Sequence, residues 1–243
     1  MSGAEPNGLP ATYDADRLEV QRLAVHVLAR ARHQAVGRFG LVATPGGVGT
    51  PAFGPDATVV RLSGPALLVE RGGDVTATPL AGATLRALAE VAGADLAVDL
   101  SVGHDTPPPG DLDGPIAIDP ASVAAIGRWL ALGTAAIDEV VAGLGAATSP
   151  ARTQVWPEHF DAGTNVAVGP GADDRVNLGA STGDGFHAAP YLYVGPWSAD
   201  RPGDAAYWNA PFGAVLGWDD VAGALDPTAT AIAFLREGLA RFA

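Results

Sequence analysis

The sequence contains no lysine and no cysteine. All 14 basic residues are arginine and stand against 27 Asp and Glu, so the formal net charge is 14 − 27 = −13. The missing lysine excludes Schiff-base chemistry, including a pyridoxal phosphate–lysine link, and a Walker-type phosphate lysine. The missing cysteine excludes a cysteine nucleophile, a thiolate-bound metal and a disulfide. Any catalytic role therefore falls to His, Asp, Glu, Tyr, Ser, Thr or Arg, and whether the chain is an enzyme stays open.

Charge and hydropathy exclude further classes of protein. An apolar content of 48% excludes a disordered chain, and the negative balance argues against nucleic-acid binding. No secretory signal is visible in the first residues. The best membrane-span candidate, residues 121–147, is interrupted by Arg128, Asp138 and Glu139. We therefore expect a soluble, cytoplasmic protein with neither a nucleic-acid nor a membrane partner.

The pattern along the chain predicts an α+β fold with antiparallel β-rich portions. Residues 1–14 are expected to be a loose arm, followed by a helix from about Asp16 to Gln34 and by short β-type runs over residues 38–80. Residues 95–119 form an Asp/Pro-rich connection. We expect one α+β domain over residues 15–243, with two subdomains (15–105 and 119–243) as the alternative.

Two further helices are predicted to begin with the same N-capping pattern. Asp119-Pro120 and Asp226-Pro227 each place an N-cap carboxylate before a proline at the first helical position. The first of these helices is apolar over most of its circumference and is expected to be a buried central element. The second carries Ile232, Leu235, Leu239 and Phe242 on one side, which predicts an amphipathic C-terminal helix lying on the body.

Two segments in the first half could suggest an anion site. Residues 17–38 hold five arginines and one glutamate, a local charge of +4. This stretch is interpreted either as a solvated face paired with the protein's own acidic surface or as an anion-binding face. The glycine-rich loop 44–50 matches no phosphate-binding motif and is predicted to connect a β-hairpin.

Groups capable of proton transfer, metal binding and ligand contact gather between residues 156 and 197. Of the chain's 16 aromatic residues, 12 follow residue 150. The candidate catalytic residues are Glu158, His159 and Asp161, and a divalent metal could be held by His159, Asp161, Asp184 and His187. A ligand pocket would be lined by Trp156, His187, Tyr191, Tyr193 and Trp197. The alternative is that these His and Asp side chains pin loops by binding backbone groups.

The same region carries a resemblance. The segments VWPEHFD (155–161) and VNLGASTGDGFHAAPYLYVGPW (176–197) resemble an uncharacterised family of bacterial proteins common in actinobacteria. The resemblance covers about 70 residues of the C-terminal half. It implies a bacterial origin and marks residues 156–197 as the characteristic region, but it implies no activity, because the family has none established.

Three functional hypotheses follow. The first is a small-ligand-binding protein with its pocket around residues 156–197, so that a small molecule is the expected partner. The second is a divalent-metal-dependent hydrolase or isomerase with Glu158 as general base. The third is a scaffold or homo-oligomerisation module that uses Tyr207, Trp208 and Phe212 as interface.

Overall fold

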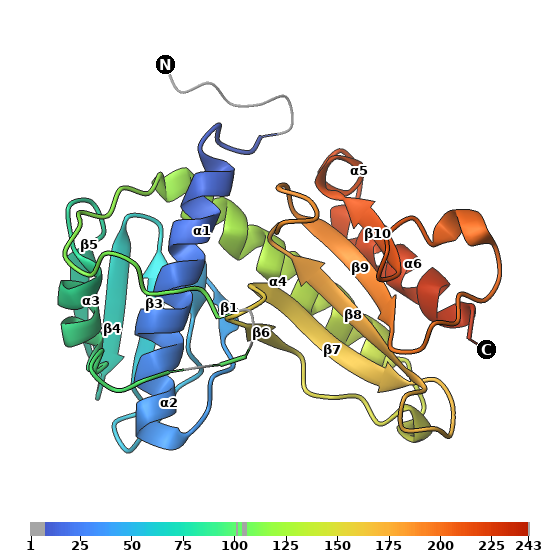
Figure 1. Cartoon of the computed structure of the whole chain (residues 1–243), viewed down its shortest axis with the longest axis horizontal. Coiled ribbons are helices and arrows are strands. Elements are labelled where there is room, and N and C mark those ends of the chain that lie inside the picture. Colours follow the sequence, from blue (N-terminus) through green and yellow to red (C-terminus); the bar gives the residue numbers. More distant parts are fainter. Residues whose placement is uncertain (1–7, 101, 104–105, 243) are drawn as a thin grey trace. The chain divides into compact units, whose positions relative to one another are not determined.

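The computed structural model of the chain has an α+β fold, as predicted (Figure 1). It describes residues 8–100, 102, 103 and 106–242. The chain divides into two compact units. Unit 1 comprises residues up to Arg128 together with Val155–Phe160, and unit 2 comprises Trp129–Gln154 and Asp161–Ala243. The division therefore falls inside a helix, whereas the subdomain alternative placed it in the Asp/Pro-rich connection.

Unit 1 begins with one long helical stretch in three parts. These are α1 (Tyr13–Leu23), the π-helical η1 (Ala24–Ala29) and α2 (Arg30–Val36), which ends at Gly37 in a left-handed conformation. The helix begins three residues before the predicted start, so residues 13 and 14 of the expected arm are helical; residues 1–7 of that arm lie outside the described part. Val20, Leu23, Val27 and Ala31, which recur at helical spacing along this stretch, are buried.

The first sheet is an antiparallel meander in the order β1-β2-β3-β4-β5. Its strands are β1 (Val42–Thr44), β2 (Gly47–Gly49), β3 (Val59–Ser63), β4 (Ala66–Arg71) and β5 (Asp74–Pro79). Thr44 pairs with Gly47, so the predicted hairpin connection is confirmed. Helix α3 (Leu85–Ala92) follows and is capped by Thr84, whose Oγ1 accepts from the Ala87 N–H at 3.1 Å.

Most arginines of the first helical stretch do not form the solvated face that one interpretation expected, although Arg17 and Arg22 do pair with the acidic residues Asp14 and Glu19. Arg17, Arg30, Arg32 and the neighbouring His26 are buried. Arg22 donates to the carbonyl oxygens of Pro109 and Asp111, and Arg30 donates to those of Asp95 and Val98. These guanidinium groups hold the described parts of the 95–119 connection along the helix, which also leaves them little capacity to bind an external anion.

The predicted central helix is α4 (Pro120–Ala142), and it contributes to both units. In unit 1 the Gly127 backbone lies so close to Gly47 that an added Cβ would stand 2.5 Å from the Gly47 nitrogen. In unit 2 a Cβ on Gly133 would stand 2.2 Å from the Ala180 Cβ. The helix is long and apolar enough to cross a membrane, yet 56% of its most apolar window is buried. That burial is typical of a core helix in a soluble protein.

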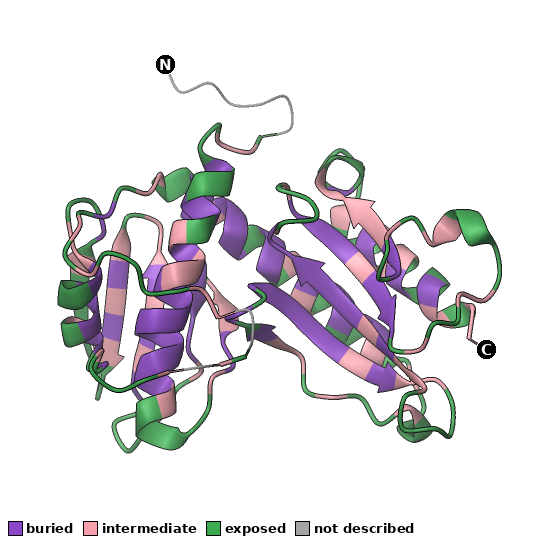
Figure 2. Cartoon of the chain, in the orientation of Figure 1, coloured by how far each residue is buried: buried purple, intermediate pink, exposed green. Residues whose placement is uncertain are grey.

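The second sheet has the strand order β10-β9-β8-β7-β6. Its strands are β6 (Gln154–Trp156), β7 (Asp161–Ala167), β8 (Arg175–Ser181), β9 (Tyr191–Pro196) and β10 (Ala214–Gly217). Two short 3-10 turns, η2 (Ala146–Thr148) and η3 (Ala205–Tyr207), flank them. Buried residues run along the central strands in Figure 2.

Helices α5 (Trp218–Ala222) and α6 (Pro227–Ala240) complete unit 2. Asp226 caps α6 as predicted, because its Oδ1 accepts from the Ala229 N–H at 2.9 Å. A Cβ on Gly238 of α6 would stand 2.7 Å from Val194 Cγ2 of β9. Val194 points to the same face of the sheet as Ala180, which contacts α4 at Gly133, so α4 and α6 cover the same face (Figure 1). Leu235 is buried in this layer, which confirms the predicted C-terminal helix on the body of the protein.

Candidate functional site

The two faces of the second sheet differ in chemistry because side chains alternate along a strand. The face covered by α4 and α6 carries Ala180 and Val194, both fully buried. On the opposite face, Asp161 of β7 lies opposite Ser181 of β8, and Ser181 lies opposite Tyr191 of β9. This second face, carrying Asp161, Ser181, Tyr191 and Tyr193, is called the polar face below.

Tyr193 reaches across β8 to bind Asp161. Its partner in register is Gly179, and a Cβ on that glycine would stand 2.1 Å from Tyr193 Cζ. Only a residue without a side chain allows the ring to lie over β8 in this way. The Tyr193 hydroxyl donates to Asp161 Oδ2, and Asp161 is itself buried. Two strands that are not neighbours are thus joined by one hydrogen bond between side chains.

A second tyrosine–carboxylate pair lies beside the first. The Tyr191 hydroxyl donates to Asp184 Oδ2 at 2.6 Å, and Ser181 also hydrogen-bonds this hydroxyl. Oδ1 of Asp184 accepts from the backbone N–H groups of Phe186 and His187 at 2.8 and 3.1 Å. Asp184 therefore pins the loop between β8 and β9, which is the structural role that the sequence left open for it.

Burial and the adjacent carboxylates keep both tyrosines protonated. Burial is the largest cause that raises the pKa of Tyr191 and of Tyr193 above the usual 10. Asp184 raises the pKa of Tyr191 further, and Asp161 does so for Tyr193, because each carboxylate accepts the hydrogen bond of the neutral phenol. At neutral pH these phenols are fixed hydrogen-bond donors and are poor general bases.

Aromatic rings extend the polar face toward solvent. Phe186 and Phe212 meet edge to face with ring centroids 5.1 Å apart, and Phe212 lies 6.3 Å from Tyr191 and 6.4 Å from Tyr193. Phe186 is 47% exposed and Phe212 is 37% exposed. The two tyrosine–carboxylate pairs therefore lie next to an exposed apolar patch. The sequence reasoning did not include Phe186 in the site, although it directly precedes His187.

The structure divides the candidate residues between the two units. Asp161, Asp184, His187, Tyr191, Tyr193 and Trp197 belong to unit 2, whereas Trp156, Glu158 and His159 belong to unit 1. Residues 157–160 form a turn, so His159 and Asp161 do not alternate along one extended strand. Within this turn Glu158 is buried, and its carbonyl accepts from Gln21 Nε2 at 2.6 Å, while His159 is exposed.

Phe160 gives this turn an unusual backbone. Its φ is +53°, a left-handed conformation, and its side chain is fully buried. A bulky residue in that region of φ/ψ costs on the order of 1–2 kcal/mol, and such positions cluster at functional sites. Burial of the aromatic ring offsets the cost. Phe160 directly precedes Asp161, the first residue of β7.

Trp197 lies far from the tyrosine pairs within unit 2. It directly follows β9 and is six residues beyond Tyr191, a distance of about 20 Å along an extended strand. Its Nε1 donates to Asn177 Oδ1 at 2.8 Å, and the Arg175 guanidinium lies 5.8 Å from its ring centroid. Trp197 therefore belongs to the other end of the polar face. It does not line one compact pocket with Tyr191.

The described residues contain no group of three or more His, Asp or Glu side chains placed to hold a metal ion. The four predicted ligands His159, Asp161, Asp184 and His187 are all described, and they form no such group. Asp184 is already engaged by Tyr191 and by two backbone N–H groups, and Asp161 accepts from Tyr193. The metal site thus stays a prediction that this geometry does not support.

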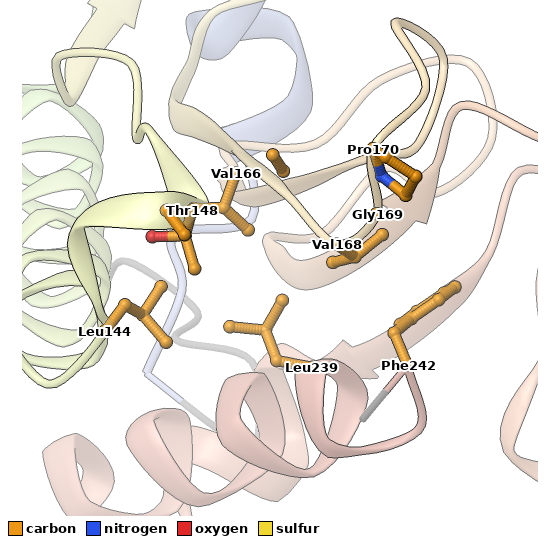
Figure 3. A pocket seen from close by; sticks show the side chains of 10 residues that line it. Leu144, Thr148, Val166, Val168, Gly169, Pro170, Leu239 and Phe242 are labelled. Carbon is orange, nitrogen blue, oxygen red and sulfur yellow. The ribbon is translucent and has the colours of Figure 1, made fainter.

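Unit 2 also contains an apolar groove at the opposite end of β7, a feature that no sequence motif indicated. It has a volume of about 540 Å³ (Figure 3). Its wall is made by η2 and the segment before it, by the end of β7 with the β7–β8 connection, and by the end of α6 with the residues after it. The lining residues are Leu144, Ala147, Thr148, Val166, Ala167, Val168, Gly169, Pro170, Leu239 and Phe242. The apolar spacing of Leu239 and Phe242 was visible in the sequence but was assigned to packing against the body.

No protein-family model, curated protein or solved structure matches the chain. The resemblance of residues 155–197 to an actinobacterial family therefore stays a prediction, and the function has to be argued from the geometry of the site.

Proposed function

We propose that the protein binds a small organic molecule on the polar face of unit 2. The ligand would carry a hydrogen-bond-donating, preferably cationic, nitrogen beside an apolar ring. The nitrogen would face the carboxylates of Asp161 and Asp184, and the ring would contact Phe186 and Phe212. We place this soluble protein in the bacterial cytoplasm.

The observation that supports the proposal is the alignment of Asp161, Ser181 and Tyr191 across three neighbouring strands. Rigid strands position side chains more precisely than loops do, so these groups are pre-organised before a ligand arrives. Two carboxylates beside aromatic rings favour a cation by charge attraction and by cation–π contact. Unit 2 holds five arginines against twelve Asp and Glu, so its formal charge of 5 − 12 = −7 adds to this preference.

Binding is favoured over catalysis because neither tyrosine can act as a general base, whereas the charge of the carboxylates attracts a cationic nitrogen. Both tyrosines are held as neutral donors, and Asp184 accepts three hydrogen bonds. The hydrolase or isomerase alternative lacks a clustered set of metal ligands among the described residues. The scaffold alternative is less favoured, because Tyr207 already packs on Phe234 and Trp208 on Phe242 within unit 2.

NMR amide chemical-shift mapping with tryptamine as a cationic probe and indole acetate as its anionic counterpart tests the proposal. Tryptamine should shift the amides of residues 161, 181, 184–187 and 191–193, and indole acetate should not. Asp184→Asn removes one negative charge from the polar face and should weaken tryptamine binding by about tenfold. Asp173→Asn removes the same charge from an exposed position in another loop of unit 2 and is the matched control. Equal shifts with both probes, or equal losses in both variants, would contradict the proposal.

A further inference from the structure

The apolar groove of unit 2 differs from the polar face in its position, in the polarity of its lining and in its lack of charged side chains. It begins where β7 ends, at Val166 to Val168, whereas the polar face begins with Asp161 at the other end of that strand. Its volume of about 540 Å³ lies within the range of about 300–1,000 Å³ that is usual for small-molecule pockets. Leu144, Leu239 and Val168 point into it from three separate segments of the chain (Figure 3).

Three donors beside the groove are already used. The Thr148 hydroxyl, the one polar side chain of the lining, donates to the Gly145 carbonyl at 2.8 Å. The backbone N–H of Val168 donates to the Asp174 carbonyl, and that of Phe242 donates to the Leu239 carbonyl. A carboxylate or phosphate entering the groove would therefore lose water without gaining these donors, which is costly for a charged group.

The lining also offers no cation. None of its ten residues is charged, and two arginines that flank the lining segments, Arg241 and Arg175, are engaged elsewhere. Arg241 pairs with Glu237 at 2.6 Å and stacks over Tyr207, while Arg175 donates to Asn165 and to the Ser149 carbonyl. Because unit 2 is also acidic, the groove disfavours an anionic ligand by local contacts and by the surrounding field.

We infer that this groove is a binding site for the aliphatic chain of an uncharged, lipid-like molecule. The hydrophobic effect supplies the attraction, since all the large side chains of the lining are apolar. The head group of such a ligand has to be neutral, for example an alcohol, and has to remain at the open edge of the groove. This inference is independent of the proposed function, because it uses none of the residues of the polar face.

Fluorescence of N-phenylnaphthylamine, a neutral probe that brightens in apolar sites, tests the inference with the full chain. Decanol and decanoate serve as competitors that share a chain length and differ in charge. We expect wild-type protein to enhance the probe emission and decanol to displace it at least about tenfold more effectively than decanoate does. No enhancement, or equal displacement by the two competitors, would overturn the inference.

Two pairs of variants locate the site. Ala147→Trp fills the groove from an exposed position and should abolish probe binding, whereas Ala146→Trp, exposed in the same turn but outside the lining, should not. Leu239→Arg introduces a cation into the lining and should reverse the preference so that decanoate competes better than decanol, while Ala240→Arg should leave it unchanged. If wild type sediments as a dimer and Ala147→Trp as a monomer, a second copy of the chain occupies the groove and the inference is wrong.

Discussion

The Tyr191 hydroxyl donates to Asp184 Oδ2 at 2.6 Å and thereby ties the loop between β8 and β9 to the strand that follows it. The other oxygen of Asp184 accepts from two backbone N–H groups of the same loop. One carboxylate therefore shapes the edge of the polar face, and the position of the exposed Phe186 depends on it.

Replacing Asp184 with alanine should destabilise the protein by about 2 kcal/mol, because three hydrogen bonds are lost and the largely buried Tyr191 hydroxyl loses its acceptor. Asp184→Asn keeps acceptor capacity and should cost about half as much. Urea denaturation gives the free energies of unfolding. Asp173→Ala, an exposed aspartate in another loop of unit 2, is the control and should stay within about 0.5 kcal/mol of wild type. A change in Asp184→Ala no larger than in this control would show that the loop is held by other contacts.

Lowering the pH should destabilise unit 1 through His26. His26 is buried, its Nε2 donates to the Pro107 carbonyl at 2.7 Å, and Arg30 donates to its Nδ1 at 3.3 Å, an arrangement that suits the neutral ring. Burial lowers the pKa of His26 below the usual 6.5; the hydrogen bond to Pro107 opposes this shift, and the charges of Arg30 and Arg22 add to it. The unfolded chain therefore takes up the proton first, and stability falls as the pH drops below about 6.5 toward the lowered folded value.

The free energy of unfolding measured between pH 7.5 and pH 5 checks this expectation. His26→Gln retains a donor for Pro107 without titrating, so its stability should depend less steeply on pH than that of wild type. His159→Gln changes an exposed histidine and should retain the wild-type slope. Parallel pH profiles for wild type and His26→Gln would refute the role assigned to His26.

Gly133→Ala should destabilise unit 2 by about 1–3 kcal/mol, although alanine is normally the better helix former. The added methyl group would stand 2.2 Å from the Ala180 Cβ and would push α4 away from β8. Gly145→Ala is the control, because a Cβ there meets nothing within 4 Å. Thermal and urea unfolding of both variants measure the effect, and a stabilised Gly133→Ala would mean that α4 does not pack closely on the sheet.

Asp226→Ala should cost about 1 kcal/mol, because the Ala229 N–H loses its cap at the start of α6. Asp226→Ser supplies another good N-cap side chain and should restore most of this loss. Denaturant unfolding of the three proteins is the measurement. A serine variant as unstable as the alanine variant would indicate that the charge of Asp226, and not its hydrogen bond, stabilises the helix.

Local patterns were sufficient to predict the class and order of the elements. The caps at Asp226 and the hairpin at 44–50 follow from interactions within a few residues, so they are visible in any single sequence. The absence of lysine and cysteine likewise excluded whole classes of chemistry without reference to the fold.

The surroundings of individual side chains required the tertiary structure. The local charge pattern around His26 and Arg30 predicts a solvated face, yet both residues are buried. Their partners are the backbone carbonyl groups of Asp95, Val98 and Pro107. A pattern of side chains in the sequence does not show which backbone carbonyl groups will accept hydrogen bonds. The turn at 157–160 was missed because a buried phenylalanine with positive φ contradicts local preference.

For the site, the sequence alone determined which residue types were available and that they concentrate between residues 156 and 197. Only the tertiary structure decided their grouping. Strand register brought Asp161, Ser181 and Tyr191 into one row, and the missing side chain of Gly179 let Tyr193 join them. The same register places Trp197 at the far end of the polar face. Register and burial depend on contacts between residues distant in the sequence, and such contacts leave no local periodicity from which they can be read.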